Sequence, residues 1–336
     1  MTRQKARVAL IGLGPIGIEV GKALAGRADI ELLGAADPAP DKAGKPLSSL
    51  LDGAFPGTTV TESAARLYGD SASRRAKTDV AVLCTGSRLH SMLPQIEEAI
   101  DAGLHIVSTC EELSYPELRH HPMALKIDQR ARAKGVAVLG TGVNPGLVMD
   151  RLVLAVASAC VTVSSVRVTR VVDAAKRRGP LRAKVGAGLT RAEFDAGVAA
   201  KKLGHVGLSE SAAIIALGLG LPIDEITETI KPVIAEKETD GVPAGRVLGL
   251  HQVALVQGGD EPKVVLDLTM AVGAPDPADR IDVDGDPPIH VVAEGGFHGD
   301  RSTIGTVVNA VPFIVSAKPG LHNVVTLPLF GLQPLG

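Results

Sequence analysis

The sequence is poor in residues on which several classes of protein depend. It contains no tryptophan, and aromatic residues make up only 2% of its 336 residues. Proteins that bind single-stranded nucleic acid stack the bases on aromatic side chains, so this class is disfavoured. The three cysteines are too few and too widely spaced for a disulfide scaffold or a zinc cluster. They fit a reducing compartment, and we expect a cytoplasmic protein.

Neither sign of charge dominates, because 35 Lys and Arg residues face 37 Asp and Glu residues. A nucleic-acid partner is therefore not expected, since such binding needs excess positive charge to displace counterions. Long apolar runs are also missing. The most apolar stretch, residues 212–223, is interrupted by Gly218, Gly220 and Pro222, whereas a membrane span needs about 20 apolar residues. We expect no membrane partner and no metal, and a small molecule as substrate.

The first half of the chain alternates strands and helices. Continuous apolar runs, typical of strands buried on both faces, predict strands at 8–11, 30–36, 79–84, 104–110 and 135–140. Helical spacing lies between several of them, at 15–24, 93–102 and 123–134. This alternation predicts an α/β fold with a Rossmann-type, doubly wound parallel sheet.

The pattern changes after about residue 155. Strands are expected at 163–173, 226–238, 246–256, 263–272, 280–284 and 289–293. Hairpin turns are predicted at Gly258-Gly259-Asp260 and at Asp284-Gly285. Helices are predicted at 190–200, with a capping box of Thr190 and Glu193, and at 209–218. The predicted domains are a Rossmann domain (1–154), an α+β substrate and dimerisation domain with a mostly antiparallel sheet (155–302), and a segment returning to the Rossmann domain (303–336).

A glycine motif opens the first helix and is the strongest chemical signal. Gly12-Leu13-Gly14-Pro15-Ile16-Gly17 matches the dinucleotide fingerprint and follows a predicted strand. Gly12 permits the tight turn, Gly14 lets the backbone approach a pyrophosphate, and Gly17 lets helix and strand pack closely. Pro15 and Ile16 are the first residues of the predicted helix. The N–H groups in the first turn, which begin at Ile16 because proline has none, then face the phosphates. The motif predicts a dinucleotide cofactor.

Asp37 ends the next strand, where it can accept hydrogen bonds from the adenosine ribose. Its carboxylate favours NAD, because it repels the 2′-phosphate of NADP. Lys42 and Lys45 follow closely and could weaken that preference, as could Arg88 in the loop after the third apolar run, although each is better explained as a solvated surface charge. We therefore expect NAD(P)H, with a slight preference for NAD.

Ligands of such sheets bind beyond the carboxyl ends of the strands, so polar residues there are candidate site residues. Three such segments are Thr85-Gly86-Ser87, Cys110-Glu111-Glu112 and Thr141-Gly142-Val143-Asn144-Pro145-Gly146. A carboxylate after a buried strand can act as a general acid or base. Neighbouring residues of a strand point to opposite sides, so only Glu111 or Glu112 should face the nicotinamide. Alternatively, both cap the helix that begins near Pro116. Asn144 either binds the cofactor carboxamide or fixes its loop.

Several stretches resemble the 2,4-diaminopentanoate dehydrogenase family and the native NAD(P)H-dependent amine dehydrogenases grouped with it. In the first domain these are the glycine motif, Val107–Ser114 and Gly142–Gly146. Further along the chain they are Arg170–Asp173, Pro180-Leu181, Lys184–Gly188, Gly204–Leu208, Val307–Pro312 and Pro319–His322. The resemblance covers nearly the whole chain.

The resemblance implies a dihydrodipicolinate-reductase-like architecture, a homodimer, and NAD(P)H-dependent interconversion of a carbonyl plus ammonia with a primary amine. The essential glutamate of the family matches Glu111 or Glu112. The more distantly similar homoserine dehydrogenases have a catalytic lysine that lines up with Glu111, so Glu111 is the first choice. Tyr115, Val143 and His205 are expected to line the substrate pocket, although packing for Tyr115 and a structural role for His205 are alternatives.

Two departures narrow the function. His120-His121-Pro122 lacks the continuation of the reductase motif, which argues against reduction of dihydrodipicolinate. Thr326-Leu327-Pro328 stands where the family often has Asp-Leu-Pro, so the natural substrate need not be a diamine. Two other functions remain open. One is a dehydrogenase of the homoserine or diaminopimelate type, acting on a small amino or hydroxy acid, and the other is a non-catalytic NAD(P)-binding regulator.

Overall fold

The computed structural model describes residues 5–68, 78–176 and 179–327. The chain forms two compact units, one of residues 1–147 with 299–336 and the other of residues 148–298. The domain boundaries expected after residues 154 and 302 thus differ by a few residues from the limits of these units. Helix α5 (Arg151–Ala157), which the expected boundary cuts, lies wholly in the second unit.

The first unit contains a parallel sheet. Its strands, in the order β12-β5-β4-β3-β1-β2 across the sheet, are β1 (Ala6–Ile11), β2 (Ile30–Ala36), β3 (Val80–Leu83), β4 (His105–Ser108), β5 (Ala137–Gly140) and β12 (Gly320–His322). All pairings between them are parallel, which confirms the predicted doubly wound sheet. Strand β12 was not predicted, because three residues are too few to show an apolar run.

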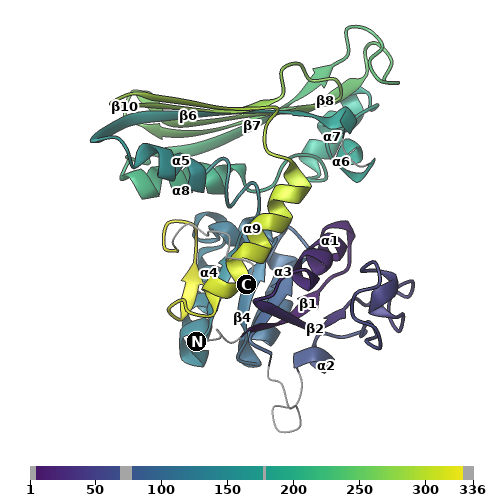
Figure 1. Cartoon of the computed structure of the whole chain (residues 1–336). Helices are drawn as coiled ribbons and strands as arrows, with labels where there is room; N and C mark the ends of the chain where they lie inside the picture. The colour runs from purple at the N-terminus through teal and green to yellow at the C-terminus, as the bar shows by residue number, and fades with distance from the viewer. Residues whose placement is uncertain (1–4, 69–77, 177–178, 328–336) are drawn as a thin grey trace. The chain divides into compact units, whose positions relative to one another are not determined.

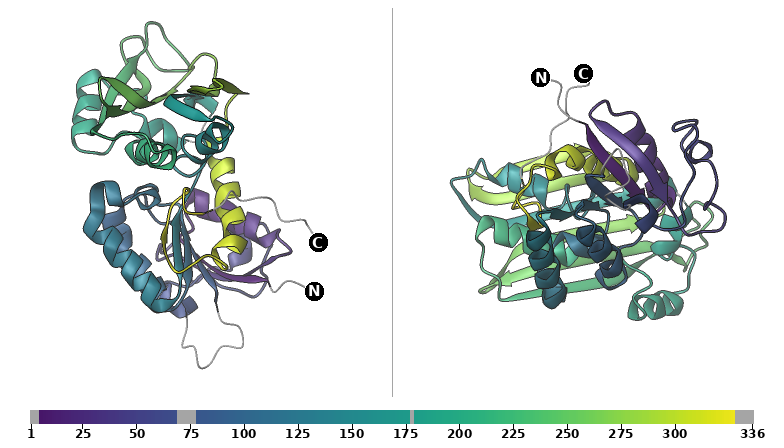
Figure 2. Two further views of the ribbon diagram at one scale, coloured as in Figure 1. Left: turned by 90° about the vertical axis from the view of Figure 1, so that its left-hand side faces the viewer. Right: turned by 90° about the horizontal axis from the view of Figure 1, so that it is seen from below.

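Helices cover both faces of this sheet (Figure 2). Helices α1 (Pro15–Ala25) and α9 (Gly299–Ile314) share one core with Val8 and Leu10 of β1. Helices α3 (Leu89–Asp101) and α4 (Glu117–Lys134) share the other core with Ala9 and Ile11. Alternate residues of one strand are thus buried on opposite faces, which explains why the strands read as continuous apolar runs. The remaining short elements are η1 (Leu47–Ser49), α2 (Ala65–Tyr68) and η2 (Glu111–Ser114).

The strand order reverses at β1, which lies between β2 and β3. A crevice forms at such a point beyond the carboxyl ends of the strands, because the connections on its two sides run in opposite directions. The glycine turn follows β1, and the Thr85 and Glu111 segments follow β3 and β4. The topology therefore brings the candidate segments to one edge of the sheet.

The second unit contains a mixed, mostly antiparallel sheet in the order β11-β10-β6-β9-β8-β7. Its strands are β6 (Thr162–Asp173), β7 (Glu225–Ile234), β8 (Val247–Gly258), β9 (Glu261–Ala271), β10 (Ala278–Asp286) and β11 (Ile289–Glu294). Within this sheet, as far as the structure describes it, only the β6–β9 pairing is parallel. Its other helices are η3 (Ala174–Lys176), α6 (Gly179–Lys184), α7 (Arg191–Ala199) and α8 (Leu208–Leu219). The predicted capping box of Thr190 and Glu193 is confirmed at α7.

One predicted turn is confirmed and one is wrong. Gly259, with a φ of +73°, lies in the connection of the β8–β9 hairpin, as predicted. Asp284 and Gly285 instead lie inside β10, where the pairing with β6 shifts register. The chain turns after Asp286, at two consecutive prolines that lack the N–H needed to continue a ladder.

Only one face of the second sheet carries helices within the described part of the chain, and α5 and α8 lie on it (Figure 1). The opposite face of this sheet carries polar, charged and apolar side chains. A row that crosses all six strands on this face consists of Thr229, Val253, Asp267, Thr169, Arg280 and Val292. In the next row Leu255 and Val265 lie side by side.

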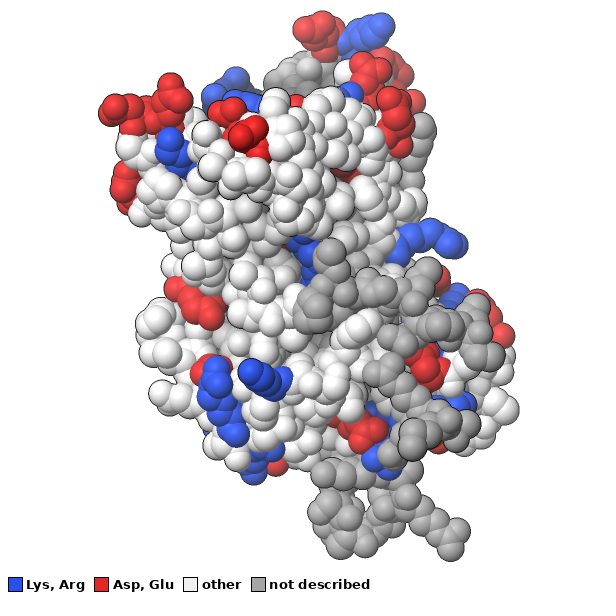
Figure 3. Space-filling view, turned by 60° about the vertical axis from the view of Figure 1, so that its left-hand side comes forward, with Lys and Arg blue, Asp and Glu red and all other residues white. Residues whose placement is uncertain are grey.

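The surface carries charges of both signs. On the side seen in Figure 3, acidic and basic side chains are interspersed among uncharged ones in both units. This agrees with the formal net charge of −2. Among the described residues, we find no helix with the combination of length and apolar character that crossing a membrane requires.

Candidate active site

The glycine turn after β1 has the shape that the fingerprint predicts. Gly12 adopts a φ of +90°, and a Cβ there would lie 2.6 Å from Thr85 Cγ2 and 2.8 Å from the carbonyl oxygen of Cys84. A Cβ on Gly17 would overlap the carbonyl oxygen of Gly12. Both glycines are therefore required by packing inside the protein, since any side chain would push the turn away from its neighbours.

Gly14 differs, because a Cβ added there would meet nothing within 4 Å. It is the N-cap residue of α1, followed by Pro15 at the first position, and no side chain of the described residues caps this helix end. Open space thus lies in front of a helix N-terminus, where backbone N–H groups favour an anion. These features fit the pyrophosphate of a dinucleotide.

Asp37 is bound to this turn. Its carboxylate accepts hydrogen bonds from the backbone N–H groups of Leu13 (2.7 Å) and Ala39 (2.9 Å) and from Lys42 Nζ (3.1 Å). Burial raises the pKa of Asp37, but the two N–H groups and the Lys42 ammonium outweigh it, so that the pKa lies below its ordinary value of 3.8. The interpretation of Lys42 as a solvated surface charge is wrong, because it pairs with Asp37. Lys45 is exposed.

The segment after β3 contacts the segment after β4. The carbonyl oxygen of Ser87 accepts from the backbone N–H of Glu112 (3.2 Å) and from Cys110 Sγ (3.3 Å). Thr85 is exposed and donates its hydroxyl to Gln95 Oε1 (2.7 Å). A Cβ on Gly86 would lie 3.2 Å from Met92 Sδ, so this loop lies close against α3.

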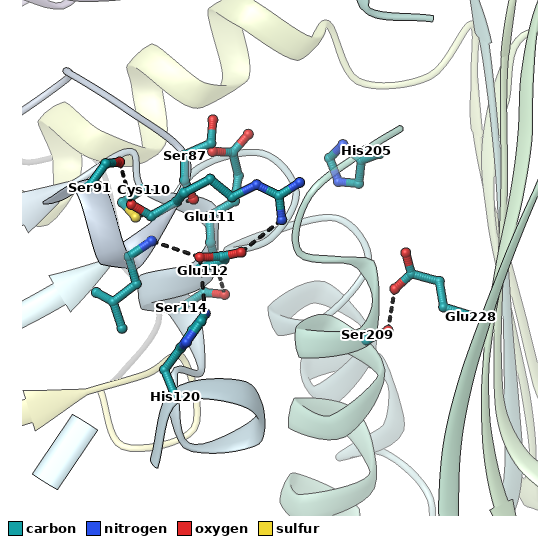
Figure 4. A network of polar contacts seen from close by, with 12 residues as sticks. Ser87, Ser91, Cys110, Glu111, Glu112, Ser114, His120, His205, Ser209 and Glu228 are labelled. Atoms are coloured by element: carbon teal, nitrogen blue, oxygen red, sulfur yellow. Dashed lines mark hydrogen bonds and ion pairs between the residues drawn. The ribbon is translucent and has the colours of Figure 1, made fainter. Parts of the chain in front are cut away.

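Glu112 is the centre of a polar network (Figure 4). Its carboxylate accepts from Arg88 Nη1 (2.8 Å) and from the backbone N–H of Leu89 (2.7 Å), and lies 3.2 Å from His120 Nε2. The residue is only 5% exposed. Burial raises the pKa of Glu112, but Arg88, the Leu89 N–H group and His120 lower it to below its ordinary value. Glu112 is therefore an ionised, firmly held carboxylate.

These contacts correct two sequence interpretations. Arg88 is not only a solvated charge, since it pairs with Glu112. The sequence also allows both glutamates to cap the helix near Pro116. Glu112 instead caps α3 at Leu89, because the strand order brings the end of β4 beside the start of that helix.

Glu111, the first residue of η2, differs from its neighbour in burial. It is half-buried, whereas Glu112 is buried. Tyr115 ends this short helix and is also half-buried. Burial, followed by the charge of Glu117, raises the pKa of the Tyr115 hydroxyl. Of the two glutamates, Glu111 is thus the one with more access to solvent.

The segment after β5 is held by α9. The backbone N–H of the half-buried Val143 donates to Thr303 Oγ1 (3.1 Å). Asn144 is 7% exposed and precedes a cis peptide bond to Pro145. The segment after β5 therefore lies at the same edge of the sheet as the glycine turn, against α9, the last helix among the described residues.

His205, the remaining candidate, belongs to the second unit. Gln252 holds its backbone: the His205 N–H donates to Gln252 Oε1, and Gln252 Nε2 donates to the His205 carbonyl, each at 2.8 Å. Gln252 Nε2 also donates to Glu228 Oε1 (2.8 Å), and Ser209 Oγ donates to the other oxygen of Glu228. Gln252, Glu228 and Ser209 were not singled out in the sequence. The sequence does contain one signal for this group, because Gln252 is a polar residue at an inward-facing position of the otherwise apolar strand β8.

The His205 ring is in an environment that opposes protonation. Its Nε2 atom is buried and has no hydrogen-bond partner among the described residues. Burial lowers the pKa of His205, and the positive charges of Lys184 and Arg170 lower it further, to about 3. The ring is therefore neutral in the folded protein at neutral pH.

We predict that this ring makes folding stability depend on pH. The unfolded chain takes up a proton on His205 below about pH 6.5 and the folded chain does not, so stability is lost as the pH falls from 6.5 toward 3. Urea unfolding measures the free energy of unfolding at pH 7 and at pH 5.5. Between these two pH values it should fall by about 1 kcal/mol more in the unmodified protein than in His205→Asn. Equal decreases in the two proteins would contradict a buried, neutral ring.

Comparisons with known proteins agree with these features. A family model described as the 2,4-diaminopentanoate dehydrogenase C-terminal domain matches residues 147–332. The 2,4-diaminopentanoate dehydrogenase of Acetoanaerobium sticklandii is 30% identical over 339 residues, covering 97% of this chain and 94% of the relative.

Solved structures share the fold. An amine dehydrogenase from Mycobacterium smegmatis is 22% identical with a TM-score of 0.84, over 98% of each chain. A scyllo-inositol dehydrogenase from Lactobacillus casei, solved with NAD(H) and scyllo-inositol, is 13% identical with a TM-score of 0.59, over 93% of this chain and 88% of that one. Together with the glycine turn and the two sheets, the family model and the 30% identical relative show that the chain belongs to the 2,4-diaminopentanoate dehydrogenase family of NAD(P)-dependent oxidoreductases.

Proposed function

We propose that the chain catalyses the NAD(P)H-dependent reductive amination of a small ketone or aldehyde with ammonia, and the reverse oxidative deamination. In the forward direction a carbonyl compound, ammonia, NAD(P)H and a proton give a primary amine, NAD(P)⁺ and water. The similarity to 2,4-diaminopentanoate dehydrogenase over nearly the whole chain supports an amine as the product. The glutamates at the carboxyl end of β4 in the first sheet support the proton transfers that this reaction needs.

The observation that carries this proposal is the unequal environment of the two glutamates after β4. Glu112 already accepts from Arg88 and Leu89 and contacts His120, so proton transfer by this carboxylate would break a buried network. Glu111 is half-buried at the same strand end. We therefore assign the acid/base role to Glu111 and a positioning role to Glu112, which holds the segment that carries Glu111 against the start of α3.

A carboxylate is suited to each stage of this reaction. Glu111 takes a proton from ammonium, which leaves ammonia able to attack the carbonyl carbon. It then returns a proton to the carbinolamine hydroxyl, which departs as water. The ionised carboxylate next stabilises the positive charge of the substrate iminium. When bound, the nicotinamide supplies the hydride that reduces the iminium carbon.

The substrate is proposed to be small and aliphatic, since aromatic residues are scarce throughout the chain. 2,4-Diaminopentanoate is one candidate for the reverse reaction. Thr326 supports a broader choice, because it stands where the family often has an aspartate. Its hydroxyl donates to the Asn323 carbonyl (3.2 Å) and accepts from the Asn323 N–H (3.1 Å) in a local turn. Pro328 of this motif lies outside the described residues.

The proposal predicts that NAD(P)H oxidation requires a carbonyl compound and ammonium together. A panel of short ketones, aldehydes and amino ketones, each with and without ammonium chloride, should show turnover only with both reactants. Absorbance at the nicotinamide band measures the rate, and chromatography of the amine measures the product. Potassium chloride at equal ionic strength is the control.

The same panel distinguishes the alternative functions. A dehydrogenase of the homoserine or diaminopimelate type that forms alcohols would oxidise NAD(P)H without ammonium. A regulatory protein would bind the dinucleotide in calorimetry and show no oxidation with any carbonyl compound. Either result would contradict reductive amination.

A pair of variants tests the two glutamates. We expect Glu111→Gln to lower the rate by about 100-fold or more, since general acid–base catalysis contributes at least this much. Its unfolding free energy and its dinucleotide affinity should change little. Glu112→Gln should instead lower the unfolding free energy by about 1–3 kcal/mol, because a buried charged network loses its acceptor charge. Full activity in Glu111→Gln would move the catalytic role elsewhere.

The family resemblance and the open face of the second sheet support a homodimer as the assembly. Val253, Leu255 and Val265 lie together near the middle of that face, and each is directly paired with a neighbour on the same face. A second copy that covers this face with its own would remove the half-buried Val253 and Leu255 from water, whereas Val265 is already buried within one chain. Burial of apolar surface is the main favourable term in such association.

We predict that Leu255→Glu weakens self-association. A charge on this face must lose its hydration in the dimer, so the mass in sedimentation equilibrium should shift from two chains to one. Lys126→Glu, on an exposed residue of α4 in the first unit, is the control and should keep the dimer. A single-chain mass for the unmodified protein would rule out the homodimer.

A further inference from the structure

A buried glutamine of the second unit holds the backbone of His205. Gln252 lies on β8 and is fully buried. Its amide oxygen accepts from the His205 N–H, and its amide nitrogen donates to the His205 carbonyl oxygen and to Glu228 Oε1, each at 2.8 Å. Both N–H donors of the amide are therefore used, and the side chain joins the loop that carries His205 to the sheet.

Glu228 decides which way the amide of Gln252 points. A carboxylate accepts hydrogen bonds and donates none, so the amide nitrogen has to face Glu228. This leaves the amide oxygen for the N–H of His205. Ser209 Oγ donates to the other oxygen of Glu228 and holds this carboxylate in turn (Figure 4). The four residues form one chain of hydrogen bonds with a single arrangement of donors and acceptors.

The loop needs such a contact, because its own sequence leaves it free to adopt several conformations. Gly204 (φ +118°) and Gly207 (φ +96°) lie on either side of His205. Glycine populates backbone conformations with positive φ as readily as those with negative φ, so these two positions do not restrict the loop. Groups outside the loop therefore have to fix the backbone of His205, and Gln252 supplies two hydrogen bonds for this.

The ring that this backbone carries has an unused polar atom. His205 Nε2 is buried and has no hydrogen-bond partner among the described residues. Buried polar atoms of native proteins nearly always have a partner, so a bound molecule is expected to supply one here. The neutral ring can hydrogen-bond to that molecule only where the loop places it.

We propose that Gln252 and Glu228 are positioning residues of the substrate site, which hold His205 so that its Nε2 atom hydrogen-bonds the carbonyl substrate. The inference rests on the proposed function, because it requires a carbonyl compound bound beside His205. It extends the site to a chain of hydrogen bonds on two strands of the second sheet, β7 and β8.

The test measures steady-state rates against the concentration of the carbonyl compound, at saturating NAD(P)H and ammonium. Gln252→Met keeps the length of the side chain and removes its hydrogen bonds. We expect it to raise the KM for the carbonyl compound by about fivefold or more and to change kcat by less than about twofold, as for the loss of a hydrogen bond that contributes to substrate binding. The KM for NAD(P)H should not change.

The chain offers a matched control on the same strand. Gln257 also lies on β8, and its side chain donates to the Gly259 carbonyl oxygen (3.2 Å). Gln257→Met makes the same exchange away from His205 and should leave kcat and both KM values unchanged.

A double variant separates positioning from a merely structural role. His205→Leu should raise the KM for the carbonyl compound by a similar factor. If Gln252 acts through His205, adding Gln252→Met to His205→Leu raises this KM no further. A structural defect would instead reduce the fraction of active enzyme, which lowers kcat and leaves KM as it is.

Glu228 provides a second route that does not depend on the folding of Gln252→Met, since it is half-buried on the edge strand β7. Glu228→Met should raise the KM, and Glu228→Gln, which keeps an acceptor for Gln252, should raise it less. An unchanged KM in both Gln252→Met and Glu228→Met, or independent effects of Gln252→Met and His205→Leu, would overturn the positioning role and leave the proposed function standing. Absence of ammonium-dependent turnover in the unmodified protein would overturn both.

Discussion

The buried carboxylate of Glu112 is the interaction on which the candidate site depends. It joins Arg88 at the end of the β3 segment, the first turn of α3 through Leu89, and His120 of α4. An ionised group at this depth is stable only while its donors surround it, because an unpaired buried charge has a large desolvation penalty. The arrangement of these three segments therefore follows from one side chain.

Asp37 has the same function on the other side of β1. Its carboxylate fixes the glycine turn through Leu13 and its own loop through Ala39, and it holds Lys42 beside the expected ribose position. Two carboxylates thus organise the edge of the sheet, Asp37 mainly through backbone N–H groups and Glu112 through one backbone N–H group and two side chains. Neither is well placed to shuttle protons, which is why the half-buried Glu111 is the better candidate for the chemistry.

Much of the fold could be predicted from the sequence because local signals were strong. Continuous apolar runs located five of the six strands of the first sheet, and Thr190 with Glu193 located the start of α7. The turn predicted at Asp284-Gly285 lies further along the chain, because glycine also occurs at irregular positions of strands and the two prolines that follow decide where β10 ends. Strand β12 forms only because it pairs with β5.

The sequence by itself determined the class of fold, the glycine turn, and which short segments carry the candidate site residues. These follow from periodicity and from backbone conformations that only certain residues adopt. The tertiary structure decided which groups touch: that Glu112 pairs with Arg88, that Lys42 pairs with Asp37, and that Gln252 holds His205. The first and last of these contacts join residues from different elements, and all three depend on burial and on distances of a few ångströms, which no local pattern of residues encodes.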